Sequence, residues 1–186
     1  MTQPDRVVRM HRRACDGFSR VAALVAVDQW TVPTPCREWD AAALVEHVIG
    51  FHDVLLLRPL SVRANRPRTD PAARWEATAT TLFAALAVDG VLDRTTDLVG
   101  GGSSSPRRIL PALTTDVLVH TWDLASAIGE PAELDVDLCR VSLAAIQTTG
   151  IPRDDMFGPE LPIGADADAA DALVAYYGRD PAWRAG

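Results

Sequence analysis

Residues 106–129 read PRRILPALTTDVLVHTWDLASAIG, and this stretch decides the fold class. Apolar side chains recur along it at the spacing of one helix face: Leu113, Val117 and Leu124. This periodicity indicates an amphipathic helix, and glycine is the residue that most readily adopts the left-handed conformation at a helix end. We therefore predict a helix from about Pro106 to Ile128, ended by Gly129.

Helical periodicity and capping residues recur on both sides of this stretch. The further predicted helices cover residues 5–28, 41–58, 71–89, 136–149 and 167–177. Asp40 and either Thr69 or Asp70 are suitable N-caps, and Gly150 can end the helix that precedes it. The run GGGSSS at residues 100–105 predicts a mobile loop between two of the helices.

The whole chain, residues 1–186, is predicted to be one all-α domain. Aromatic residues make up only 6% of it while Ala, Leu and Val are frequent, which favours helices over a β-sandwich. Four longer helices joined by short loops predict a four-helix bundle, with additional short helices around it. We expect residues 151–186 to form a largely extended C-terminal segment that packs on the bundle.

Charge and cysteine content restrict the class of function. A formal net charge of −7 and a pI of about 5.0 predict no nucleic-acid partner, and the arginines between Arg6 and Arg13 have the spacing of a solvated helix face. Three cysteines without a CxxC pair indicate a reducing compartment. The polar N-terminus predicts no signal peptide, and charges interrupt the apolar runs, so we expect a cytoplasmic protein without a membrane partner.

The strongest chemical signal is the segment Asp116-Val-Leu-Val-His120-Thr-Trp-Asp123. On a helix, Asp116 and His120 lie one turn apart on the same face, and Asp123 follows three residues further along that stripe. A carboxylate and an imidazole at this spacing can bind one metal ion. They can equally form only a salt bridge or a capping contact, so the pair alone leaves both interpretations open.

His47 lies on the apolar face of the second predicted helix, where an ionisable side chain needs a partner. A histidine in such a place is often a hydrogen-bonded core residue. If the second and fourth longer helices face each other, however, His47, Asp116 and His120 converge as a metal site with open positions. This donor set suits zinc, iron or nickel. We interpret His52 as a surface residue, and His11 has no identifiable partner in the sequence.

Three segments together resemble a known family. They are TPCREWDAAALVEHVIG at residues 34–50, DVLVHTWDLASAIGEP at residues 116–131 and FGPELPIGADADAADALVAYYGRDPAW at residues 157–183. The first two resemble motifs of the DinB-like, mycothiol-dependent maleylpyruvate isomerase N-terminal family, and the third resembles the C-terminal signature of its actinobacterial, single-domain metal-binding branch.

The resemblance implies an up-down-down-up DinB-like bundle with a divalent metal at one end, usually zinc and sometimes nickel. The family's ligands, a histidine on the second helix and an acidic-x-x-x-His pair on a later one, correspond to His47, Asp116 and His120. Asp116 stands where the isomerases have glutamate. The larger isomerases also carry an extra C-terminal domain for which 186 residues leave no room, so activity on maleylpyruvate itself is not expected.

Three functions follow from these residues. The first is a metal-dependent thiol transferase or isomerase-like enzyme that uses mycothiol, with Asp123 orienting His120 and with Trp39 and Trp122 as pocket walls. The second is a non-catalytic metal-binding or stress-response module. The third is a metal-dependent hydrolase, for which Asp123 or Glu46 would be the base. We expect a small-molecule substrate or thiol as partner, and the family's habit of dimerising implies a homodimer.

Overall fold

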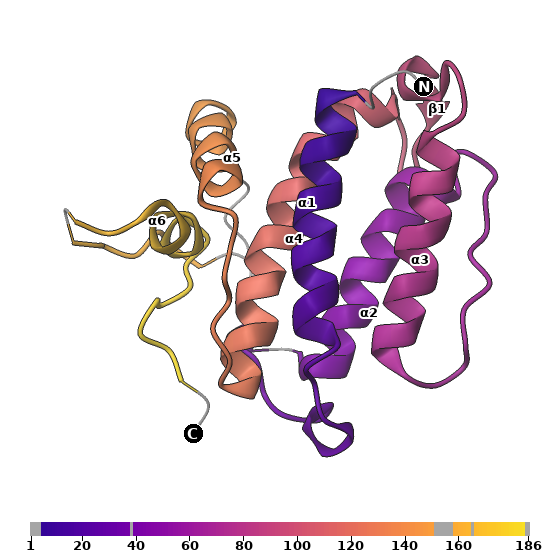
Figure 1. Cartoon of the computed structure of the whole chain (residues 1–186). Coiled ribbons are helices and arrows are strands. Elements are labelled where there is room, and N and C mark those ends of the chain that lie inside the picture. Colours follow the sequence, from indigo (N-terminus) through magenta and orange to yellow (C-terminus); the bar gives the residue numbers. More distant parts are fainter. Residues whose placement is uncertain (1–4, 38, 151–157, 165, 185–186) are drawn as a thin grey trace.

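The computed structural model describes residues 5–37, 39–150, 158–164 and 166–184, and it is an all-α structure (Figure 1). Its bundle consists of four helices: α1 (Arg6–Ala22), α2 (Ala41–His52), α3 (Pro71–Leu86) and α4 (Pro106–Ile128). In Figure 1, α1 and α4 run downwards while α2 and α3 run upwards. This is the up-down-down-up order of the DinB type, so the predicted fold class is confirmed.

Local capping explains where the bundle helices begin and end. The carboxylate of Asp40 accepts a hydrogen bond from the amide of Ala43 at 2.8 Å, and Asp70 caps α3 in the same way through Ala73 at 3.1 Å. Gly129 ends α4 with a φ of 75°, a left-handed conformation that glycine adopts without steric cost. These ends agree with the predicted ones, whereas α1 stops at Ala22 and is shorter than expected.

The second predicted helix, residues 41–58, changes character inside its span. Its α-helical part ends at His52, and a π-helical turn, Asp53–Leu57, continues it. The amide of Arg58 donates to the carbonyl of Asp53 at 2.8 Å, which is the wider i to i+5 bond of that turn. The carboxylate of Asp53 is bound by Arg66 from the following loop. Short 3-10 helices precede α2 (Val27–Gln29) and follow α3 (Val91–Asp93).

The glycine-rich loop before α4 is more regular than predicted. Two short antiparallel strands, β1 (Thr96–Asp97) and β2 (Ser103–Ser104), pair Thr96 with Ser104 and Asp97 with Ser103. The turn between them uses Gly100, Gly101 and Gly102, all with positive φ. Two residues per strand are too few to produce a detectable alternation in the sequence, which is why it predicted only an irregular loop.

The C-terminal third packs beside the bundle, against α4. Helices α5 (Val136–Thr149) and α6 (Ala169–Tyr176) contact each other, and both contact α4 (Figure 1). The prediction that residues 151–186 pack on the bundle falls partly on residues 151–157, 165 and 185–186, which lie outside the described residues. Among the helices of the described part, none combines the length and the apolar character needed to traverse a bilayer.

Candidate metal centre

His47 of α2 and the pair Asp116 and His120 of α4 meet at one point in the bundle. The Nε2 atom of His47 lies 3.7 Å from Oδ1 of Asp116, and Nε2 of His120 lies 3.5 Å from the same oxygen. One donor atom from each of the three side chains lies within 4.8 Å of the other two. The structure therefore brings together the three residues that the sequence singled out, from two helices that pack on each other.

The carboxylate of Asp116 is the focus of the charge in this cluster. Burial by itself would raise its pKa, but the charge and hydrogen bonding of His120 and His47 outweigh burial and lower it. Its second oxygen, Oδ2, is buried and has no hydrogen-bond partner among the described residues. A buried carboxylate oxygen without a donor is costly, so this atom indicates that a cation or a further donor belongs beside it.

Asp123 holds the ring of His120 from the opposite side. Its Oδ2 lies 3.0 Å from Nδ1 of His120, and both side chains are almost completely buried. Burial alone would lower the pKa of His120, but Asp116 and Asp123 raise it to about 9. Arg179, which follows α6, donates to both oxygens of Asp123 at 3.2 and 3.3 Å. The C-terminal segment thus contributes a positive charge that the sequence motifs did not indicate.

Aromatic rings form the walls around the three side chains. Trp39 stacks on His47 with ring centroids 4.1 Å apart, and the ring centroids of Phe51 and His47 lie 4.5 Å apart. A cavity of about 10 Å³ remains between the rings and the carboxylate, and Cys36 also lines it. Trp122, predicted as a second pocket wall, is buried on α4 and is not among the residues that line this cavity.

A larger pocket lies next to this cavity. It has a volume of about 510 Å³, within the range of small-ligand sites. Cys36, Trp39 and Arg179 line both spaces, so the pocket and the three-residue cluster share a wall. The other side of the pocket comes from the C-terminal segment, including Trp183. The pocket therefore has the volume of a metabolite-sized molecule and lies directly beside the cluster.

The structure corrects the prediction about His52 and supplies the partner of His11 that the sequence did not identify. His52 is completely buried rather than exposed, because it lies one turn after Val48 on a buried face of α2. His11, for which the sequence offered no partner, lies with its Nε2 3.1 Å from Nε2 of His52. Cys15, one turn along α1, contributes its thiol at 3.4 Å from the same atom of His11. The missed signal was the i, i+4 spacing of His11 and Cys15 on the apolar face of α1.

Fold and site together define the class: an all-α, DinB-like bundle protein with two histidines and one carboxylate gathered between α2 and α4. The family model described as "Mycothiol maleylpyruvate isomerase N-terminal domain" matches residues 11–125. Two uncharacterized proteins of Mycobacterium tuberculosis, from strains CDC 1551 / Oshkosh and H37Rv, are each 35% identical to this chain over 175 residues, which is 91% of this chain and 95% of the relative. No solved structure matches. The chain belongs to the mycothiol maleylpyruvate isomerase N-terminal domain family, as the motifs at residues 34–50 and 116–131 predicted.

Proposed function

We propose that this protein binds one divalent metal ion, preferably zinc, through His47, Asp116 and His120, and that it uses a small thiol of the mycothiol class in an S-transfer or isomerisation reaction. The observation that carries the proposal is the convergence of two imidazoles and one carboxylate beside a pocket of about 510 Å³. Membership of a family named for mycothiol supports the choice of thiol.

The donor set fits such an ion. Three protein ligands of the His₂–carboxylate type leave positions for a further ligand, as in catalytic zinc sites. The unpartnered Oδ2 of Asp116 supplies an electrostatic reason for a cation. Because a single carboxylate meets two neutral imidazoles, a bound divalent ion would leave the site with a charge of about +1. That charge favours an anionic ligand. Nickel and iron suit the same donors.

Each residue around the cluster has a separate task in the proposal. A divalent ion held there would lower the pKa of a coordinated thiol, so that the thiolate forms near neutral pH. Asp123 accepts the Nδ1–H of His120, so Nε2, which faces Asp116 and His47, is the nitrogen that would give up its proton to bind the ion. Arg179, which lines both the cavity and the pocket, neutralises the buried carboxylate of Asp123 and holds it against His120.

The alternatives have less support. A non-catalytic metal-binding module does not require a ligand-sized pocket next to the metal ligands. A hydrolase requires a base beside the metal, and both candidates are engaged: Asp123 pairs with His120 and Arg179, whereas Glu46 pairs with Arg74 on α3. The thiol-dependent enzyme therefore remains the proposal.

Metal analysis of untagged protein tests the ligand set. We expect one equivalent of zinc in the wild type and a loss of it in His47→Ala, Asp116→Asn and His120→Ala. Glu46→Gln is the matched control, because Glu46 neighbours His47 in sequence but points to Arg74, and it should retain the zinc. Zinc retained by the three ligand variants, with folding verified by circular dichroism, would contradict the assignment.

A thiol assay then tests the activity. Zinc-loaded protein is incubated with mycothiol and a model electrophile, and thiol consumption is followed. Trp183→Ala, which alters the pocket but none of the proposed ligands, should keep the zinc and raise KM for the electrophile. Zinc binding without thiol-dependent turnover would reject the enzyme and leave the non-catalytic module.

A further inference from the structure

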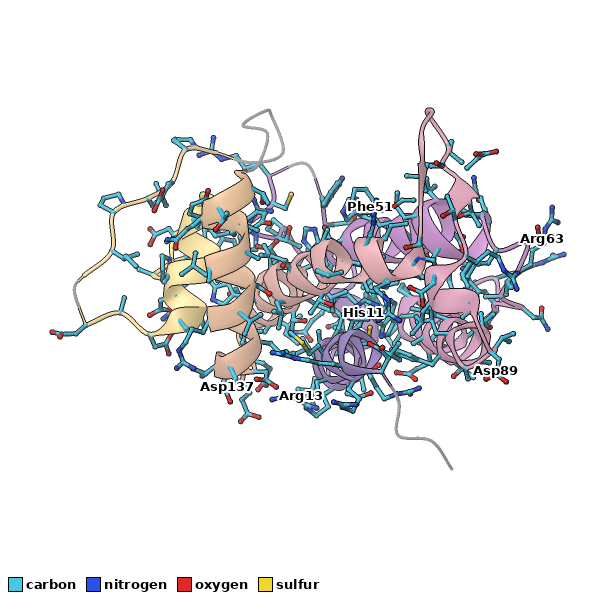
Figure 2. All side chains as sticks on the ribbon, turned by 90° about the horizontal axis from the view of Figure 1, so that it is seen from above. His11, Arg13, Phe51, Arg63, Asp89 and Asp137 are labelled. Atoms are coloured by element: carbon cyan, nitrogen blue, oxygen red, sulfur yellow. The ribbon has the colours of Figure 1, made fainter. Side chains whose placement is uncertain are left out.

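A second group of metal-binding side chains lies inside the bundle, apart from the three residues above. His11 and Cys15 come from consecutive turns of α1, and His52 comes from the end of α2. All three are buried, with exposed fractions of 0%, 1% and 0%. One donor atom of each lies within 4.8 Å of the others. Figure 2, which looks along the bundle from above, labels His11 at α1 beneath the ribbon of α4.

Hydrogen bonds fix which ring nitrogens carry protons. Nδ1 of His52 lies 2.6 Å from the carbonyl of Val48, which only accepts, so this nitrogen is protonated. Nδ1 of His11 lies 3.1 Å from the hydroxyl of Thr114, whose own hydrogen is donated to the carbonyl of Leu110. This nitrogen must therefore donate as well. In the neutral rings, both Nε2 atoms consequently carry only a lone pair.

These two lone pairs face each other at 3.1 Å, and the sulfur of Cys15 lies 3.4 Å from one of them. A shared proton would require an imidazolium in a site without solvent. Burial lowers the pKa of both histidines, and for His11 the proximity of His52 lowers it further. Even with the thiol hydrogen of Cys15 directed at Nε2 of His11, Nε2 of His52 faces another acceptor and has no donor among the described residues, an arrangement that a cation between the rings would stabilise.

From this geometry we propose that His11, Cys15 and His52 form a second, closed metal site for one thiophilic ion. Imidazole and thiolate donors bound to one ion at about 2.0 to 2.3 Å stand roughly 3.3 to 3.6 Å apart. The observed separations of 3.1 and 3.4 Å need to widen by only a few tenths of an ångström. The hydrogen bonds that the two Nδ1–H groups donate to Val48 and Thr114 orient both rings in the manner of metal-ligating histidines.

Charge and donor number favour Cu⁺ over Zn²⁺ at this site. Closed zinc sites are almost always four-coordinate, and the described residues supply three grouped donors. Soft thiolate ligands suit both Cu⁺ and zinc, so charge decides between them: two neutral imidazoles with one thiolate neutralise a monovalent ion, whereas Zn²⁺ would leave a net positive charge in the apolar interior. Burial raises the pKa of the Cys15 thiol, so binding displaces one proton, which leaves to solvent.

The metal content of protein purified after growth in copper- or zinc-supplemented medium tests the proposal. The metal is supplied during growth because the site is closed and is filled as the full chain folds. We expect one copper ion per chain in the wild type and a loss of about tenfold or more in Cys15→Ser and Cys15→Ala. Cys139→Ser, at another buried cysteine, is the matched control and should keep the copper. X-ray absorption at the copper edge should show one sulfur and two nitrogen neighbours.

Asp116→Asn separates this site from the one proposed above: it should lose zinc and keep copper. Equal copper content in wild type and both Cys15 variants, or a copper spectrum without sulfur, would overturn the second site. Zinc bound through Cys15 in place of copper would keep the site but refute the argument from charge. Circular dichroism of each variant verifies that a loss of metal is not a loss of fold.

Discussion

Removing the carboxylate of Asp123 tests how the C-terminal segment, α4 and the proposed metal ligands act together. In the wild type, Asp123 accepts the Nδ1–H of His120 at 3.0 Å and is itself held by Arg179. Asp123→Ala deletes that acceptor and lets the imidazole rotate or change tautomer. Asp123→Asn keeps an acceptor oxygen but removes the negative charge. Neither variant changes the side chain of His47, Asp116 or His120.

The expected magnitude follows from these contacts. Losing an outer hydrogen-bond partner of a metal-bound histidine typically costs about 10- to 100-fold in metal affinity, which corresponds to roughly 1.4 to 2.7 kcal/mol. Charge-assisted hydrogen bonds are roughly twice as strong as neutral ones. We therefore expect Asp123→Asn near the lower end of this range and Asp123→Ala near the upper end. Because Asp123→Ala removes the buried carboxylate that pairs with Arg179 and Asp123→Asn removes its charge, the free energy of unfolding should fall in both.

Zinc dissociation constants from competition with a chromogenic chelator provide the measurement. Thr121→Ala is the matched control, because Thr121 is equally buried on α4 and, among the described residues, its hydroxyl donates to the carbonyl of Val117 and to none of the proposed metal ligands. It should lower stability without changing zinc affinity. If folded Asp123→Ala bound zinc as tightly as the wild type, the inference that Asp123 orients a metal ligand would be refuted.

Two further predictions concern stability. Gly178 has a φ of 76°, and a Cβ there would lie 2.8 Å from the Cα of Gly158. Gly178→Ala should therefore lower the free energy of unfolding, measured by chemical denaturation, by about 1–3 kcal/mol. Gly164→Ala is the control and should be nearly neutral, because a Cβ at Gly164 meets open space. Arg107 lowers the pKa of Asp5 and of Asp93 below the ordinary value of 3.8. A carboxylate with a lowered pKa stabilises the fold above that value, and the contribution disappears as pH falls through the lowered pKa. Arg107→Gln should therefore reduce Tm at neutral pH but leave it equal to wild type in strong acid; an unchanged Tm at neutral pH would exclude this contribution.

Local sequence was enough to predict the helices and two of the three proposed metal ligands. Asp40, Asp70 and Gly129 mark helix ends because their capping bonds join residues only a few positions apart. For the same reason, Asp116 and His120 had to share a face once α4 was recognised: four residues are close to one helical turn. The sequence motifs also identified the family, whose model matches residues 11–125.

Only the tertiary structure decided which partners these residues meet. His47 reaches Asp116 because α2 packs on α4, and Arg179 reaches Asp123 across 56 positions of the chain. His52 is buried in the core, whereas the sequence-based prediction placed it on the surface. Its pairing with His11 depends on how α1 and α2 are rotated about their axes. Hydrophobic periodicity defines the buried face of a helix, but it does not define which neighbour covers that face. That choice comes from packing all the helices at once.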